Sequence, residues 1–126
     1  LHTVSGMSSD TMIYFIPVFL NINGIYYSAD ELSGMVAKTS NVPLYSNWAF
    51  LLGHGEVGGP LIRGDQHGQD VARLAQRVLS GERARDIPVQ TEIHSELLFD
   101  YAVLKARHIN MKLLPVGSQF INEPSA

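Results

Sequence analysis

Four glycines fall within the seven residues from Gly53 to Gly59, which read GHGEVGG. Their spacing matches the Gly-x-Gly-x-x-Gly fingerprint of dinucleotide sites, which needs a strand directly before the glycines and a helix that opens on them. Residues 48–52 favour a short helix before this stretch instead, and Gly59 followed by Pro60 argues against a helix at the third glycine. We therefore predict that the stretch ends a helix and that its backbone then passes close to a neighbouring segment.

Segments of strand and helix character alternate along the rest of the chain. Residues 11–18 are β-branched, aromatic and apolar on both faces, which is typical of a strand covered on both sides. Ser28 followed by Glu31 predicts a capping box that opens a helix reaching about Lys38. Further strands are expected at residues 42–46, 57–62 and 87–93, with helices at 48–52 and 99–109 and an edge strand within 113–121.

The clearest helical pattern runs from Val71 to Leu79, where apolar residues recur at helical spacing. Asp65 is expected to cap this helix, and Gly81 stands where a helix-ending glycine is common. Strands that alternate with helices predict an α/β fold with a mostly parallel sheet flanked by helices on both faces. We expect residues 1–122 to form this domain and residues 123–126 to begin a linker.

Composition and motif spacing exclude several functional classes. The chain has 126 residues, a net charge of −3 and no cysteine, so it offers neither a basic surface for nucleic acid nor thiolate ligands and nucleophiles. His54, His67, Glu56 and Asp65 lack the spacing of a metal site. Because no Gly-x-Ser-x-Gly elbow is present either, we expect neither catalysis nor a bound cofactor or metal in this domain.

Polar residues follow the predicted strands, at the sheet edge where open α/β folds bind ligands. Their amides, hydroxyl and aromatic ring could bind a small polar ligand without reacting with it. Capping or turn formation is the alternative role, and it applies most directly to Asn23, Ser46 and Asp65. The candidate ligand-binding residues are Asn21, Ser46, Asn47, Trp48 and Gln66.

Six segments in order resemble the C-terminal part of the ABC-transporter substrate-binding-protein-like family, which has the type I periplasmic-binding-protein fold. They are VPLYS at 42–46, GHGEVGG at 53–59, GQDVARLAQRVLSGE at 68–82, DIPV at 86–89, FDYAVLK at 99–105 and LPVGSQFIN at 114–122. This family also supplies the sensor domains of membrane histidine kinases and diguanylate cyclases. The resemblance covers nearly the whole chain.

The resemblance implies a binding module that holds an amino acid, a sugar or a related small molecule between two lobes that close on it. It implies the C-terminal lobe here, without most of the first lobe, in a parent anchored in a membrane with this domain on the periplasmic or extracellular side. In that fold the helix from Val71 to Leu79 packs on the first lobe, so we expect a homodimer or an exchanged arrangement to bury its apolar stripe. A small α/β enzyme or cofactor-binding domain built on the turn from Gly53 to Gly59 is the alternative.

Overall fold

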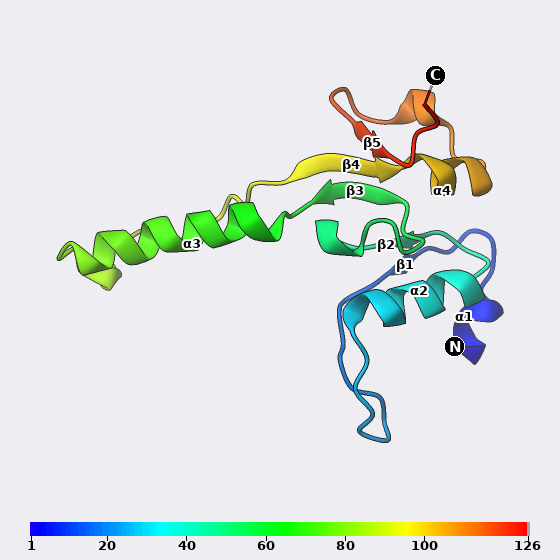
Figure 1. Cartoon of the computed structure of the whole chain (residues 1–126), viewed down its shortest axis with the longest axis horizontal. Helices are drawn as coiled ribbons and strands as arrows, with labels where there is room; N and C mark the ends of the chain where they lie inside the picture. The colour runs from blue at the N-terminus through cyan, green and yellow to red at the C-terminus, as the bar shows by residue number, and fades with distance from the viewer. Residues whose placement is uncertain (126) are drawn as a thin grey trace.

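The computed structural model describes residues 1–125, which form a mixed α/β fold. Figure 1 shows a compact body from which one long helix projects. The α-helices are α1 (His2–Ser5), α2 (Ala29–Thr39), α3 (Gly64–Leu79) and α4 (Tyr101–Ala106), with 3-10 helices η1 (Ala49–Leu51), η2 (Ala84–Asp86) and η3 (Met111–Leu113). The strands are β1 (Ile13–Tyr14), β2 (Leu44–Tyr45), β3 (Gly58–Leu61), β4 (Glu96–Asp100) and β5 (Gln119–Ile121).

The strands of the described chain form two small sheets. β1 pairs with β2 in parallel, while β4 pairs with β3 antiparallel and with β5 in parallel. Val57 joins the sheets, because its N–H donates to the Leu44 carbonyl at 2.9 Å and its carbonyl accepts from the Asp100 N–H at 3.0 Å. The predicted α/β class is confirmed, and these strands mix parallel with antiparallel pairing.

Helix α2 begins as the sequence predicts. The Ser28 hydroxyl accepts from the Glu31 N–H, and the Glu31 carboxylate accepts from the Ser28 N–H at 2.9 Å. The helix then packs on the β1–β2 sheet through a buried cluster that includes Ala29, Phe15 and Leu44. Local capping and the burial of one apolar face therefore both favour the same helix.

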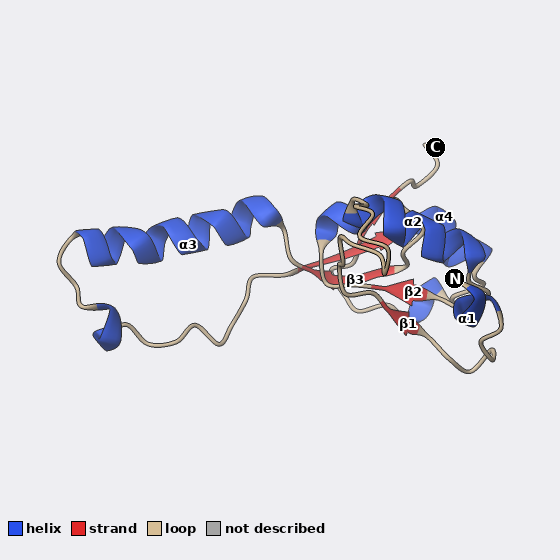
Figure 2. Cartoon of the chain, turned by 90° about the horizontal axis from the view of Figure 1, so that it is seen from below, coloured by secondary structure: helices blue, strands red, loops and turns tan. Residues whose placement is uncertain are grey.

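A second buried cluster holds α4 against β4. It contains Val57, Phe99 and Leu104. The helix predicted from residue 99 begins later, because Phe99 and Asp100 are the last residues of β4 and pair there with β5. The Asp100 carboxylate instead caps α4, accepting from the N–H groups of Ala102 and Val103 at 3.0 and 3.3 Å. Figure 2 shows α2 and α4 on the same side of the strands.

Helix α3 has no buried residue. It projects from the body beside the chain that returns to β4, as Figures 1 and 2 both show. The ring Nδ1 of His94 lies 3.1 Å from the Asp70 carboxylate and ties the returning chain to the helix. Gly81, with φ of +100°, follows the last turn as predicted. Asp65 is not the cap, since the helix starts after Arg63 and Asp65 accepts hydrogen bonds from that guanidinium.

Several predicted strand boundaries are wrong. Residues 87–93 form no strand, although their side chains alternate, and β4 follows at Glu96–Asp100. The long run at 11–18 contributes only the two residues of β1, and the segment 113–121 contributes β5 at the sheet edge. Of the expected linker, residues 123–125 have neither helix nor strand, and residue 126 lies outside the described residues.

Among residues 1–125, no helix combines the length and apolar character needed to cross a membrane.

Candidate functional site

The glycine turn has the geometry that its sequence predicts. Gly53, with φ of +97°, follows η1, and β3 starts at Gly58 with φ of +110°. A Cβ atom placed on Gly58 would lie 2.2 Å from the Leu98 carbonyl oxygen and 2.6 Å from the Phe99 Cα. The turn therefore ends a short helix and brings β3 against β4, and the order of elements is the reverse of a dinucleotide site.

Glu56 lies in the middle of this turn and is completely buried. Its two carboxylate oxygens accept from the Ser33 hydroxyl of α2 at 3.1 Å and from the Ser46 hydroxyl after β2 at 2.5 Å. Burial raises the pKa of Glu56, and the two hydroxyls and the nearby His54 oppose that effect. Nothing in the sequence indicated this burial, since an acidic residue between glycines is typical of an exposed turn.

The predicted ligand-binding residues Ser46, Asn47 and Trp48 lie together where β2 ends. The backbone of this segment pairs with the chain leaving β3: the Ile62 N–H donates to the Asn47 carbonyl at 2.8 Å. The Ser46 hydroxyl is buried and bound to Glu56. The Asn47 side chain is half-buried, and no hydrogen bond to its amide occurs within residues 1–125. The Asn47 amide is thus a polar group of this edge that no other described residue occupies.

Trp48 faces the first turn of α3. Its ring centroid lies 6.1 Å from that of His67, edge to face, and 5.8 Å from that of Phe50. The spacing of His67 in the sequence indicated only that it is not a metal ligand, so its contact with Trp48 was missed. Gln66 points elsewhere: its amide lies 3.3 Å from the Asp70 carboxylate, and it borders a cavity of about 210 Å³ with Arg63, His94 and Glu96. The segment Ser46 to Trp48 therefore connects the end of β2 to the base of the projecting helix α3 through the contact of Trp48 with His67.

Asn21 lies apart from this edge, on a hairpin that leaves the body after β1 (Figure 1). The backbone of residues 19–27 forms this hairpin, with Leu20 bridged to Tyr26. The Asn21 carboxamide oxygen accepts from the N–H groups of Asn23 and Ile25 at 2.8 and 2.9 Å. Asn21 thus shapes the turn of the hairpin, which is the role that asparagine commonly has in such turns.

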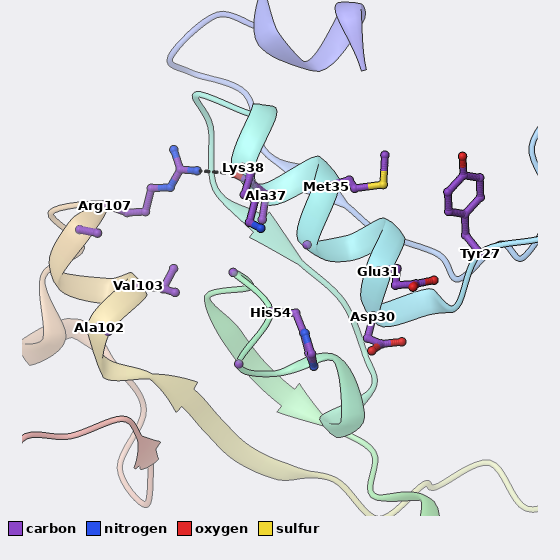
Figure 3. A pocket seen from close by; sticks show the side chains of 14 residues that line it. Tyr27, Asp30, Glu31, Met35, Ala37, Lys38, His54, Ala102, Val103 and Arg107 are labelled. Atoms are coloured by element: carbon purple, nitrogen blue, oxygen red, sulfur yellow. Dashed lines mark hydrogen bonds between the residues drawn. The ribbon is translucent and has the colours of Figure 1, made fainter.

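A larger cavity of about 870 Å³ opens between α2, the glycine turn and α4 (Figure 3). Small residues line it, including Gly34 and Ala37 one helical turn apart on α2. Figure 3 shows His54 facing Asp30 at one end and Arg107 at the other. No motif in the sequence indicated this cavity. The paired small residues on α2 were its one local signal, since they permit the close approach of Gly55 to Ala37.

Two of the charged groups around this cavity, Arg107 and Asp30, already have partners. The Arg107 guanidinium donates to the Ser40 carbonyl at 3.0 Å and closes the end of α2. A hydrogen bond from Ser28 lowers the pKa of Asp30, and the nearby His54 adds to that effect. These contacts stabilise the ends of α2, and the cavity presents mainly small apolar side chains between them.

The four side chains considered as metal ligands are directed to different places. Glu56 faces two serines in the interior, His54 faces Asp30, His67 contacts Trp48, and Asp65 pairs with Arg63. Within the described part of the chain, no three His, Cys, Asp or Glu residues are grouped closely enough to hold a metal ion.

Comparison with protein-family models, with curated proteins and with solved structures gave no match, so the function is inferred below from the residues of the chain itself.

Proposed function

We propose that this chain is the second lobe of an extracytoplasmic small-molecule-binding module, within a signal-transduction protein such as a membrane histidine kinase or within an ABC transporter. Its ligand is an amino acid, a sugar or a related polar molecule. The chain binds and does not catalyse. In the whole module the two small sheets belong to a larger, mostly parallel sheet with helices on both faces.

One observation carries this proposal: the half-buried Asn47 amide, just after β2 ends, has no hydrogen bond within residues 1–125. An amide that both donates and accepts suits the hydroxyl, carboxylate and ammonium groups of sugars and amino acids. The projecting α3 starts at the same edge, and Trp48 touches its first turn through His67. A ligand held there would therefore contact both the body and the base of the projecting helix.

A thermal-shift screen of amino acids and sugars tests this function. We expect at least one of them to raise the melting temperature of the native chain, because a ligand that binds the folded state stabilises it. Asn47→Ala should abolish that shift while leaving the unliganded melting temperature within a few degrees. Gln119→Ala, which removes an exposed amide on β5, should keep the shift.

The outcomes of the screen separate the two functional classes. Stabilisation by a nucleotide or flavin, with none by amino acids or sugars, would favour the enzyme or cofactor-binding alternative. A shift that persists unchanged in Asn47→Ala would place the ligand elsewhere, and the α2–α4 cavity would be the next site to substitute.

We also propose that the chain forms a homodimer through α3. Val71, Val78 and Leu79 share one face of this helix and are 52%, 44% and 88% exposed. An apolar face of this kind on a projecting helix favours burial against a second copy, and isologous pairing would close the assembly. A second copy of this chain is the partner that a purified sample contains, so we propose it as the occupant of this face.

Sedimentation velocity tests the dimer. We expect the native chain to sediment as a dimer at high concentration, and Val71→Glu combined with Val78→Glu to yield a monomer, because two carboxylates would enter the apolar contact. Gln76→Glu adds charge to an exposed position away from the stripe and should leave the dimer intact. A native chain that stays monomeric at high concentration contradicts the proposal.

A further inference from the structure

The buried Glu56 connects α2 to the edge at the end of β2. One carboxylate oxygen accepts from Ser33, which is itself fully buried, and the other accepts from Ser46. The Ser46 oxygen in turn lies 3.4 Å from the Trp48 N–H, which donates to it. A continuous series of hydrogen bonds therefore runs from α2 through Glu56 and Ser46 to the backbone of Trp48.

The charge on Glu56 has few compensating groups. The facing groups are the uncharged hydroxyls of Ser33 on α2 and Ser46 after β2, and the charge acting on it is that of His54 on its own turn. A buried carboxylate without a close cation is held in its ionised form mainly by hydrogen-bond donors. Two hydroxyls supply those donors here, so gain or loss of one proton changes the direction of the hydrogen bonds in the series.

We propose that Glu56 is a positioning residue for the edge formed by Ser46, Asn47 and Trp48. When Glu56 is ionised, the Ser46 hydroxyl donates to it and keeps a lone pair for the Trp48 N–H. When Glu56 gains a proton and donates it to the Ser46 oxygen, the Ser46 hydrogen must turn away from Glu56 to one of the two remaining positions around that oxygen, and one of these faces the Trp48 N–H. Protonation of Glu56 thus weakens the hydrogen bond that holds the Trp48 backbone to Ser46. The effect on ligand affinity rests on the proposed function, whereas the effect on Trp48 does not.

Trp48 is the single tryptophan of the chain, so its emission reports on this edge directly. The experiment is a pH titration of tryptophan emission on the full chain without ligand. All variants carry His67→Gln, because the His67 ring touches Trp48 and its own protonation would alter the emission. We expect an emission change with a midpoint above 4.5, the ordinary glutamate value, since burial raises the pKa of Glu56.

Three variants decide the proposal. Glu56→Gln, which keeps the shape without the titrating proton, should lose the transition, and Ser46→Ala should lose it because the link to Trp48 is cut. Ser33→Ala is the matched control: it removes the other hydroxyl and should keep the transition with a higher midpoint. Circular dichroism establishes that each variant is folded. If Glu56→Gln does not fold, the comparison of Ser46→Ala with Ser33→Ala still decides.

An unchanged transition in Ser46→Ala, or in a folded Glu56→Gln, would overturn the positioning role. Failure of the ligand screen leaves this test intact, because it needs no ligand. If the screen does yield a ligand, Ser46→Ala should weaken its binding several-fold more than Ser33→Ala does. Equal weakening would show that Glu56 acts on the fold as a whole and not on this edge.

Discussion

Gly58→Val is expected to leave little folded protein. The new Cβ would lie 2.2 Å from the Leu98 carbonyl oxygen, which belongs to the backbone of β4 where it pairs with β3 and cannot easily move away. Gly58 also has φ of +110°, which a β-branched residue rarely adopts. Strain of about 1–3 kcal/mol from the backbone and a similar cost from overpacking would remove much of the stability of a small domain. Urea unfolding and the yield of soluble protein measure the effect.

Substitutions at two other glycines separate the cost of backbone strain from the cost of steric overlap. Gly59 has φ of +147° but open space around it, so Gly59→Ala adds backbone strain without a clash and should destabilise much less. Gly68 lies within α3 with open space, and Gly68→Ala should stabilise by up to about 1 kcal/mol. A well-folded Gly58→Val with native unfolding free energy would show that the turn does not hold β3 against β4.

Glu56→Ala is expected to lower the free energy of unfolding by about 2–4 kcal/mol. The substitution leaves the Ser33 and Ser46 hydroxyls buried without their acceptor, at about 1–3 kcal/mol for each unpartnered group, and it opens a void. Removing a buried charge offsets part of that loss. Chemical denaturation at neutral pH measures the change, and Glu123→Ala at an exposed glutamate provides the control. A loss no larger than that of the control contradicts the structural role.

The pH dependence of stability gives a second measure of Glu56. Because burial raises its folded pKa above the unfolded 4.5, its proton stabilises the native state below pH 4.5, and that contribution is lost as pH rises through the folded pKa. The carboxylates of Asp30, Asp65, Asp70 and Glu82 have lowered pKa values and act in the opposite direction. The difference in the free energy of unfolding between the native chain and Glu56→Gln isolates the contribution of Glu56. We expect the native chain to be most stable relative to this variant at low pH.

Features governed by neighbouring residues were predictable from the sequence. Ser28 and Glu31 cap α2 through hydrogen bonds that span three residues, and Gly81 ends α3 through its own backbone conformation. The glycine turn was predictable in the same way, because Pro60 disfavours helical backbone at Gly59, the residue before it. Each of these features depends on dihedral preferences and contacts within one or two turns.

Features that depend on distant partners were not predictable in the same way. Residues 87–93 alternate like a strand but find no partner, while residues 96–100 pair with β3 and β5 on both sides. Asp100 caps α4 because strand pairing extends to it, which moves the helix start beyond Phe99. The α2–α4 cavity exists because two helices far apart in sequence meet the same turn.

The sequence by itself determined the α/β class, the capped α2 and the role of the glycine turn, since these follow from local backbone preferences and from the apolar pattern. Only the tertiary structure decided that Glu56 is buried between Ser33 and Ser46, that Trp48 meets His67, and that α3 projects without a buried residue. Burial and hydrogen-bond partners depend on which segments meet in space, and Glu56 and Ser33 are 23 residues apart along the chain.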